Sequence, residues 1–315
     1  MSTTSNDDRM TNISEVERET GIAKETLRVW ERRYDFPKPG RDANGERIYT
    51  SEQRSRLHLI KRLIDNGYRP GKIVNLPGEE LNELAQLAAR KSALPPPDAD
   101  DPMLAECMAL LSAHRVHELR QVMMQAQLRL GLRNFVTDLV APLTTLVGDA
   151  WAAGKLAIFE EHLYAETLQS VMRAAIFTAS QQTDREQAAP RILLTTVPIE
   201  RHGLGLLMAE ALFALEGACC ISLGVQTPLS DIVTAARAHR ADIVALSFSA
   251  GVSCRAAMDN ISQLRERLDG AADVWVGGAC AAQLMRQLGP ECVLDLEGIA
   301  GAVERWRSSR VALVD

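Results

Sequence analysis

The stretch with the clearest capacity for chemistry lies in the second half of the chain. Glu200 and His202 stand two residues apart, and Gly205 follows three residues later. Residues 192–197 before them are apolar and predict a buried parallel strand, and residues 206–212 predict a helix. A histidine at the carboxyl end of such a strand lies where open α/β sheets bind ligands. Glu200 could fix the imidazole tautomer and make the free nitrogen more basic, while glycine at 205 lets a bulky ligand approach the backbone.

A simpler alternative is that His202 sits in a strand–helix loop and only caps the following helix. Two further motifs favour a ligand site. Ser247 and Ser249 follow about forty residues later, and Gly277 and Gly278 about thirty beyond them. Together with Glu-x-His-x-x-Gly, these motifs resemble the signature of cobalamin-binding domains. Ser249 departs from that pattern, which has leucine at this position.

The resemblance implies a cobalt corrinoid, adenosylcobalamin, as cofactor. His202 would then be the lower ligand of cobalt, with Glu200 as its hydrogen-bond partner. Ser247 would bind the nucleotide tail of the cofactor, and Gly277 and Gly278 would leave space for it. Gly205 and Ser249 complete the expected lower site.

A second group of residues resembles the upper face of the light-responsive CarH and LitR-type repressors. Trp151 lies ten residues before Glu161, and His162 follows directly. The resemblance implies that the tryptophan packs near the adenosyl group and that Glu161 and His162 line the same face. The alternative is a core tryptophan and a solvated acidic helix start. Ala152 is a departure, because that family has a histidine here that captures cobalt after illumination; His162 or water would have to replace it.

The first 75 residues predict a DNA-binding head. A capping box at Asn12 begins a short helix, Gly21 makes a tight turn, and a basic helix follows over residues 23–33. Asn44-Gly45 predicts a hairpin wing, and a third helix runs to about residue 66. The runs Trp-Glu-Arg-Arg-Tyr (30–34) and Gly-Glu-Arg-Ile-Tyr (45–49) resemble the MerR-type winged helix-turn-helix. The expected DNA contacts are Lys24, Thr26, Arg28, Arg41, Arg47 and Tyr49.

The remaining chain divides by its periodicity. Residues 103–182 show four amphipathic helical segments with a kink expected at Pro142, which predicts a four-helix bundle. Strand-like and helix-like runs then alternate, which predicts a doubly wound parallel sheet. The expected fold class is multidomain: an all-α winged helix-turn-helix head, a four-helix bundle and a Rossmann-like cobalamin-binding α/β domain. The expected domains are 1–92 (head), 93–102 (proline-rich linker), 103–183 (bundle) and 189–315 (α/β domain).

Composition narrows the class of protein. The chain has 315 residues, of which 46% are hydrophobic, 24% charged and 4% aromatic, and its net charge is −6. Residues 11–75 hold 14 Lys and Arg against 10 Asp and Glu, so the basic excess is confined to one end, as expected for a DNA-binding module joined to an acidic sensor. No apolar run is long enough for a bilayer, and the first ten residues lack a signal-peptide core. Six cysteines without a Cys-x-x-Cys motif indicate reduced thiols and a cytoplasmic protein.

These observations predict a non-enzymatic repressor that binds double-stranded DNA with adenosylcobalamin in the dark and is released by light. No nucleophile with a paired base is evident. Without a heptad repeat after the wing, a homo-oligomer, dimer or tetramer, would form through the bundle and sheet. Three alternatives remain at this stage: a cobalamin or other tetrapyrrole sensor without a light role, a corrinoid carrier for methyl transfer, and a protein-interaction scaffold that binds no cofactor.

Overall fold

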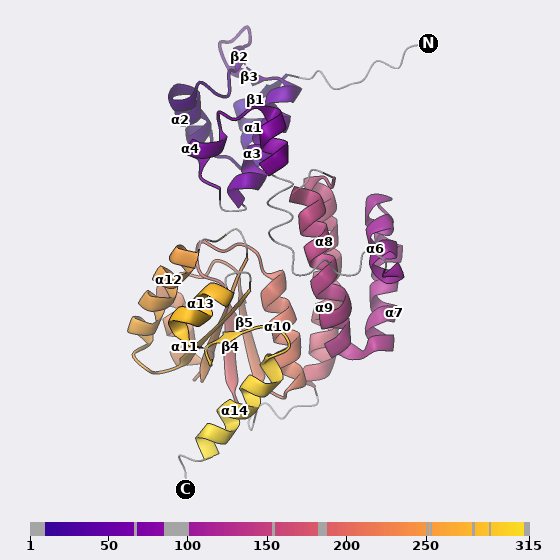
Figure 1. The fold of residues 1–315 in the computed structure, drawn as a ribbon, viewed down its shortest axis with the longest axis vertical. Coiled ribbons are helices and arrows are strands. Elements are labelled where there is room, and N and C mark those ends of the chain that lie inside the picture. The colour runs from indigo at the N-terminus through magenta and orange to yellow at the C-terminus, as the bar shows by residue number, and fades with distance from the viewer. Residues whose placement is uncertain are drawn as a thin grey trace. The chain divides into compact units, whose positions relative to one another are not determined.

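The computed structural model describes residues 10–65, 68–84, 101–152, 155–181, 188–249, 252, 254–278, 281–289 and 291–311. They form two compact units, one built mainly from Met1–Lys91 and the other from Ser92–Trp151 and Leu156–Asp315 (Figure 1). The bundle and the parallel sheet therefore belong to one unit. Most of the expected linker, residues 93–100, lies outside the described residues.

The head combines helices with a small sheet. Its helices are α1 (Ile13–Thr20), α2 (Lys24–Tyr34), α3 (Ser51–Asp65) and the short α4 (Pro70–Ile73), and residues 78–84 are also helical. The predicted capping box is confirmed, because the Asn12 side chain accepts from the N–H of Ser14 and of Glu15 while Glu15 reaches back to the Asn12 N–H. Gly21 ends α1 in the left-handed region, φ 67°, which glycine adopts without steric cost.

Three short strands form the wing sheet of the head. The head is therefore not entirely helical, although an all-α head was expected. They are β1 (Thr11–Asn12), β2 (Gly40–Arg41) and β3 (Arg47–Tyr49). All pairings are antiparallel, in the order β1-β3-β2, and β3 is central. The head core lies beneath it and includes Val16, Leu27, Trp30, Tyr49, Leu57 and Ile60.

The helical bundle consists of α6 (Pro102–Ser112), α7 (Val116–Asn134), α8 (Ala141–Ala152) and α9 (Ile158–Ser180), with a π-helical turn, η1 (Phe135–Val140), between α7 and α8. The kink expected at Pro142 is wrong in position. The chain leaves helical geometry at Gly131, φ 73° and ψ 160°, and then enters the π-turn. Glycine permits this break because it carries no Cβ, and Pro142 lies in α8, which continues without interruption from the π-turn.

The parallel sheet contains β4 (Arg191–Thr195), β5 (Cys219–Gly224), β6 (Ile243–Phe248), β7 (Asp273–Gly278) and β8 (Val293–Leu294), in the order β5-β4-β6-β7-β8. Five helices alternate with the strands: α10 (Leu204–Leu215), α11 (Leu229–Ala238), α12 (Cys254–Leu268), α13 (Ala281–Leu288) and α14 (Ile299–Val311). The predicted doubly wound arrangement is confirmed, since all strand pairs are parallel.

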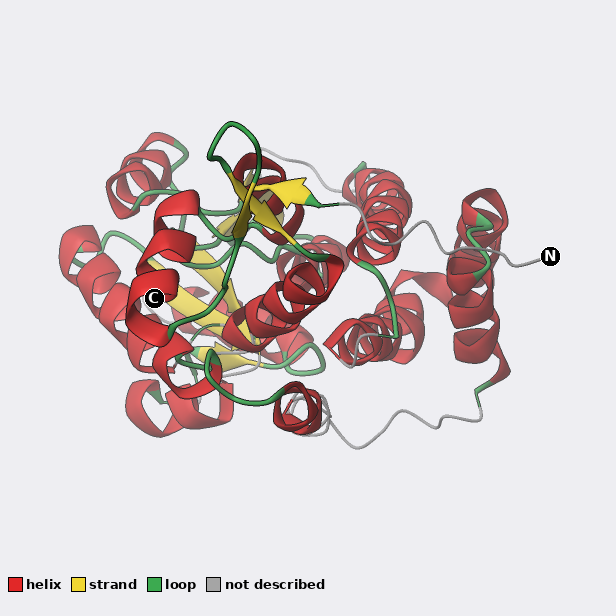
Figure 2. Ribbon diagram, turned by 90° about the horizontal axis from the view of Figure 1, so that it is seen from above, coloured by secondary structure: helices red, strands yellow, loops and turns green. Residues whose placement is uncertain are grey.

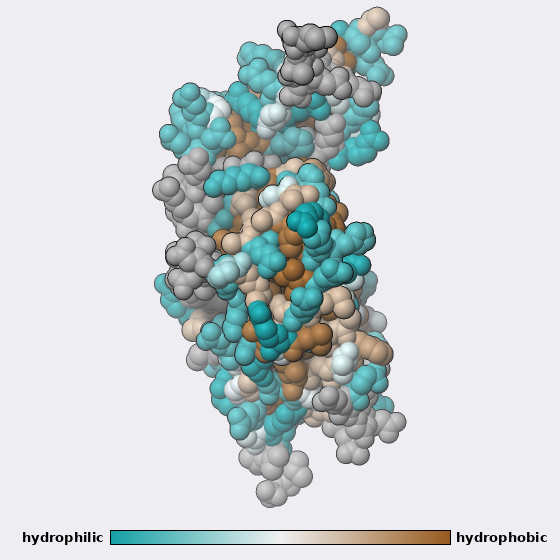
Figure 3. Space-filling model, turned by 90° about the vertical axis from the view of Figure 1, so that its right-hand side faces the viewer, coloured by the Kyte–Doolittle hydropathy of each residue, from teal (hydrophilic) through white to brown (hydrophobic). Residues whose placement is uncertain are grey.

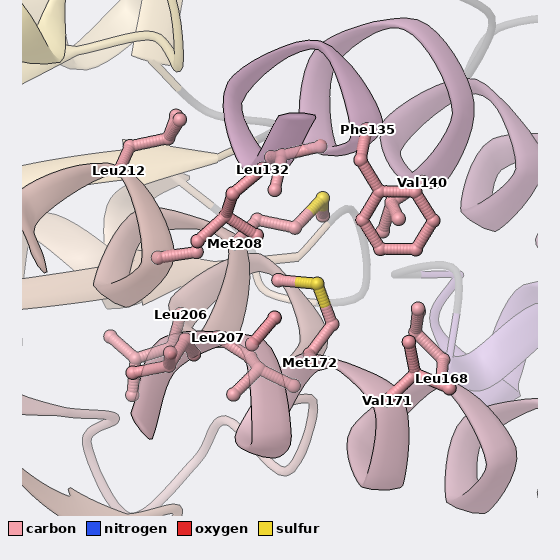
Figure 4. Close-up of a cluster of buried hydrophobic side chains, with 14 of the residues drawn as sticks. Leu132, Phe135, Val140, Leu168, Val171, Met172, Leu206, Leu207, Met208 and Leu212 are labelled. Atoms are coloured by element: carbon pink, nitrogen blue, oxygen red, sulfur yellow. The ribbon is translucent and has the colours of Figure 1, made fainter. Parts of the chain in front are cut away.

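Successive strand residues face opposite sides of the sheet, and this alternation builds two cores. Ile192 and Leu194 of β4 belong to a core with α10, α14 and the bundle, whereas Leu193 belongs to a core with α11 and α12. Figures 1 and 2 show the bundle on one side of the sheet layer. Figure 4 shows where they meet: Leu207 and Met208 of α10 lie beside Met172 of α9, with Phe135 of η1 above.

This shared core explains why the bundle and the sheet are one unit. Phe135, Leu168 and Leu212 are each buried with at most 2% exposure, so separating the layers would expose large apolar side chains. Two ion pairs cross the same boundary, from Arg173 of α9 to Glu210 of α10 and from Arg133 of α7 to Glu216. Within the described part of the chain, no helix is both long and apolar enough to cross a membrane.

Candidate functional site

The sheet topology brings the predicted ligand motifs together. Strand β6 lies between β4 and β7, and all three run in the same direction. Their carboxyl ends therefore meet at one edge of the sheet, where the Glu200–His202 loop follows β4, Ser249 follows β6, and Gly278 ends β7. In the register, Ser247 pairs with Gly277. Motifs that are 45 and 30 residues apart in the chain thus form one site.

The imidazole of His202 is held by a buried carboxylate. Glu200 is 1% exposed, and its Oε1 lies 2.7 Å from Nδ1 of His202 and accepts the His202 backbone N–H at 2.7 Å. A carboxylate only accepts hydrogen bonds when ionised, so Nδ1 carries the proton and Nε2 is the nitrogen available to a ligand. The His202 side chain is 54% exposed, so Nε2 is accessible. The predicted relation between these two residues is confirmed.

Glu200 is stabilised in its charged form despite its burial. Burial by itself acts to raise the pKa of this carboxyl group, but hydrogen bonds from the His202 ring, the Ser249 N–H and the His202 N–H outweigh it, so the pKa is lowered. The Ser249 N–H donates to Oε2 at 2.6 Å, and the Ser249 hydroxyl lies 3.1 Å from Nδ1 of His202. Ser249 therefore contacts Glu200 through its backbone N–H, which leucine would also supply, and His202 through its hydroxyl, which leucine would lack.

Glycine at 205 allows α10 to approach the sheet closely. A Cβ added there would lie 2.8 Å from Oγ of Ser247, a distance that real contacts essentially never show. Gly278 is still more restricted, with φ 104° and a hypothetical Cβ 2.1 Å from the carbonyl oxygen of Phe248. Gly278 is therefore required by the backbone at the site edge, whereas Gly205 makes room for the Ser247 side chain.

Two threonines that the sequence analysis passed over support the histidine loop. Thr196 is fully buried, and its hydroxyl donates to the Glu200 carbonyl at 2.6 Å and accepts from the Gln226 N–H at 2.8 Å. Thr195 binds the next loop instead, through the Gly224 carbonyl at 3.0 Å and the Thr227 hydroxyl at 2.7 Å. Two polar residues ending an otherwise apolar strand were the sequence signal for this role.

Apolar side chains surround the histidine at the same edge. Ile199 precedes it on its loop and is 48% exposed, and Val225, on the loop after β5, is 42% exposed. A Cβ on Gly203 would lie 3.0 Å from Cγ1 of Val225, so the two loops are adjacent. The accessible imidazole of His202 therefore shares this edge of the sheet with exposed apolar side chains.

The three residues predicted for the upper face lie on the bundle, in different environments. Trp151 of α8 is half-buried against the shared core. Burial raises the pKa of Glu161, and His162 and His202 act in the opposite direction, so Glu161 of α9 lies within electrostatic range of the histidine on the sheet. His162 is mostly exposed, at 69%, and lies 3.7 Å from Glu161. Of these residues, Glu161 is therefore the one with an electrostatic interaction with His202.

The basic residues predicted to contact DNA are each engaged within the head. Lys24 lies 3.4 Å from Glu17, and Arg28 forms an ion pair with Glu25 one helical turn away. Thr26, between them on α2, is half-buried. Arg41 donates to the Gly45 carbonyl at 2.7 Å within the wing.

Two of the predicted contacts pack against other elements of the head. Arg47 donates from Nε to Oε2 of Glu31 at 2.8 Å, which joins the wing to α2. Tyr49 is 1% exposed, and the head core encloses it. The prediction that the Tyr49 side chain contacts DNA is wrong, because this side chain is buried in the head core. Tyr49 supports the wing from within the head.

Comparisons with known proteins match all three regions of the chain. The MerR HTH family regulatory protein model matches residues 11–76, and two B12 binding domain models match residues 103–176 and 190–300. The chain joins a MerR regulatory head to a B12-binding module. It is homologous to the HTH-type transcriptional repressor CarH of Myxococcus xanthus, 29% identical over 83% of this chain and 86% of that protein. CarA of the same organism is 28% identical over 88% of this chain and 89% of its own length.

A solved structure agrees on the fold of the B12-binding module. The monomethylamine corrinoid protein of Methanosarcina barkeri matches 65% of this chain and 99% of its own, with a TM-score of 0.51 and 16% identity, and it shows the fold alone. The model over residues 190–300 spans β4 to the start of α14 and includes the His202 loop, Ser247 and Gly277. The model over residues 103–176 covers the bundle and includes Trp151 and Glu161. The matched relatives are regulators, so the chain is not grouped with enzymes.

Proposed function

We propose that this protein is a transcriptional repressor that binds DNA with adenosylcobalamin in the dark and is released from DNA by light. The observation that carries the proposal is the His202 site: an accessible imidazole, fixed by buried Glu200 and approached by Glu161 of the bundle. CarH and CarA, which are similar to this chain over most of its length, are transcriptional repressors. The protein would act in the cytoplasm, where its DNA is accessible.

The lower face of the module fits a cobalt corrinoid. Nε2 of His202 would be the cobalt ligand, and Glu200 would strengthen it by accepting the Nδ1 proton. Ile199 and Val225 would contact the apolar edge of the macrocycle, because both are exposed beside the histidine. Ser247 would bind the nucleotide tail, with Gly205, Gly277 and Gly278 at the entrance to its site and Ser249 against the histidine.

The upper face would be supplied by the bundle. Trp151 would pack against the adenosyl group, and Glu161 would accept hydrogen bonds from its ribose hydroxyls, with His162 at the margin. When bound, adenosylcobalamin supplies a cobalt–carbon bond that light can break. Contacts of Trp151 and Glu161 with the adenosyl group would exist only in the dark, so their loss would bias the position of the bundle against the sheet.

A light-dependent oligomer would connect this change to DNA. Figure 3 shows apolar residues along the face of the module where α6 and α7 lie, and Met124 and Leu128 of α7 are 51% and 79% exposed. An exposed apolar stripe of this kind supports self-association. A dimer or tetramer assembled through the module would hold two MerR heads at the spacing of two half-sites on double-stranded DNA.

The test uses the full chain reconstituted with adenosylcobalamin, before and after green light. The expected results are a spectrum that changes on illumination, a larger species in the dark by sizing chromatography, and dark-only binding to a duplex selected from a random pool. His202→Ala should remove the spectral features of histidine ligation. Hydroxocobalamin, which lacks the light-sensitive bond, should give no response to light.

A second variant addresses Ala152, which has no atom that can bind cobalt. Ala152→His should prolong the illuminated state, measured as the time for which DNA binding stays low after the light is turned off. Equal size and equal DNA affinity in dark and light, with photolysis of bound cofactor demonstrated, would refute the light switch and leave a cobalamin-binding regulator. An unchanged spectrum in His202→Ala would refute the assigned ligand.

A further inference from the structure

An ion pair in the head joins the wing to α2, the second helix of the helix-turn-helix, here called the recognition helix. Nε of Arg47 donates to Oε2 of Glu31 at 2.8 Å, and its NH2 group donates to Oε1 at 3.4 Å. The two side chains are 27% and 29% exposed, so the pair is largely shielded from water. Two nearly parallel hydrogen bonds fix the orientation of the guanidinium as well as its distance. The hydrogen bond to Glu31 raises the pKa of Arg47, as expected for a stably paired cation.

The pair connects two elements that are 16 residues apart in the chain. Glu31 lies on α2, which also carries Arg28, and Arg47 begins β3, the central strand of the wing sheet. The wing turn is closed by its own bonds: Oδ1 of Asp42 accepts from the N–H of Asn44 at 2.9 Å and of Glu46 at 2.8 Å. A turn that is internally closed moves as a body, so a side-chain link at its base sets its direction relative to α2.

We propose that Arg47 is a positioning residue that holds the wing at a fixed angle to the recognition helix through Glu31, and that it is not a phosphate contact. This rests on the proposed binding of DNA by the head. If Arg47 turned toward a phosphate, it would leave the Glu31 carboxylate partly buried and unpaired, which is costly, and would set a negative charge near the DNA backbone. Both hydrogen bonds of the pair would also be lost.

A second ion pair on the same helix provides the contrast. Arg28 and Glu25 are 44% and 78% exposed, and the pair links two residues of α2 without touching the wing. Glu25 therefore only competes with DNA for Arg28. Removing either glutamate subtracts one negative charge from α2, yet the two removals have opposite expected effects: loss of Glu25 strengthens DNA binding, and loss of Glu31 weakens it.

The first experiment follows the wing in the free full-length protein by amide hydrogen exchange. Glu31→Ala should speed exchange in the wing sheet, residues 40–49, whereas Glu25→Ala should leave it unchanged. The double mutant Glu31→Arg/Arg47→Glu swaps the two charges. It should restore slow amide hydrogen exchange because the ion pair can form again. Equal exchange in wild type and Glu31→Ala would overturn the inference whether or not the protein binds DNA.

The second experiment measures affinity for a duplex selected from a random pool by the wild-type protein, over a series of salt concentrations. Glu31→Ala and Arg47→Gln should each weaken binding about fivefold, and the double mutant should be no weaker than either, because both remove one pair. Arg47→Lys should weaken binding similarly, since lysine cannot make the two-bond contact. Glu25→Ala should strengthen binding about twofold, as expected from the small energy of an exposed pair.

The salt dependence separates positioning from contact. Arg47→Gln should leave the slope of log affinity against log salt concentration unchanged, whereas Arg28→Gln should reduce it by about one. A slope reduced by about one in Arg47→Gln, or tighter binding by Glu31→Ala, would show that Arg47 binds phosphate and overturn the inference. Failure of the wild type to bind any duplex would instead refute DNA binding, and the exchange experiment would still decide the role of the pair.

Discussion

Replacing Thr196 by valine tests whether the buried threonine hydroxyl positions the ligand histidine. Valine keeps the shape of the side chain but can neither donate nor accept, so two hydrogen bonds are lost. The carbonyl of Glu200 loses its donor in a residue that is 1% exposed, and the Gln226 N–H loses its acceptor. No other contact of the site needs to change.

The expected size of the effect follows from these two bonds. A buried carbonyl without a partner costs about 1–3 kcal/mol, and the loss of the second, less buried bond costs about 1 kcal/mol. A total of about 2–4 kcal/mol corresponds to a fall in Tm of about 4–16 °C for a unit of this size. Because the loop carries His202, cobalamin affinity should fall about 10–100-fold, as for other changes behind a metal ligand.

Thr195→Val is the matched control. Thr195 is equally buried, and the two shortest contacts of its hydroxyl are to Gly224 and Thr227, with a longer one of 3.4 Å to the Thr196 carbonyl and none to Glu200 or His202. Thr195→Val should lower Tm by a similar amount to Thr196→Val and should change cobalamin affinity much less. The assays are differential scanning calorimetry and titration with cobalamin followed by absorption. If Thr196→Val bound cobalamin as tightly as wild type, or no more weakly than Thr195→Val, the positioning role would be wrong.

Two further predictions concern the same site. Gly205→Ala should lower Tm by several degrees, because the added Cβ would lie 2.8 Å from Oγ of Ser247. Ser247→Ala in the same chain should recover most of the loss, since the next nearest atom, Cβ of Ser247, lies at 4.0 Å. No recovery in the double mutant would contradict this steric explanation. Glu161→Gln should raise Tm by about 2 °C at pH 7 and not at pH 4.5. Burial raises the pKa of Glu161 above its ordinary value of 4.5, so its ionisation costs the folded state stability as pH rises through that raised pKa. A Tm difference that is the same at both pH values would show that the charge is not the cause.

Local sequence patterns determined most of the fold. The capping box at Asn12, the strand before His202 and the helix following it all lie where periodicity and turn chemistry predicted them. These elements depend on neighbours within a few residues, which a sequence displays directly. The pairing of Glu200 with His202 was predictable for the same reason, since the two residues share one short loop.

Contacts between distant residues could not be predicted in this way. Thr196 and Gln226 are 30 residues apart, and Glu31 and Arg47 are 16 apart, so nothing in either local pattern specifies the partner. The sequence offered arginine and tyrosine on a wing and thereby suggested DNA contacts at Arg47 and Tyr49. Packing gave the first to Glu31 and buried the second, because a small head must use some of its polar and aromatic side chains to hold its own sheet in place.

The break at Gly131 shows the same limit within a single helix. Proline at 142 was the stronger local signal, but the helix continues through it from the π-turn over residues 135–140. Gly131 is equally compatible with a helix and with the positive φ that it adopts, so its residue type alone did not reveal the break. Sequence therefore determined which elements form and which residues could bind a metal. The tertiary structure decided which side chains remain accessible and which ones hold the others in place, because burial and partnership depend on residues that meet only after the chain has folded.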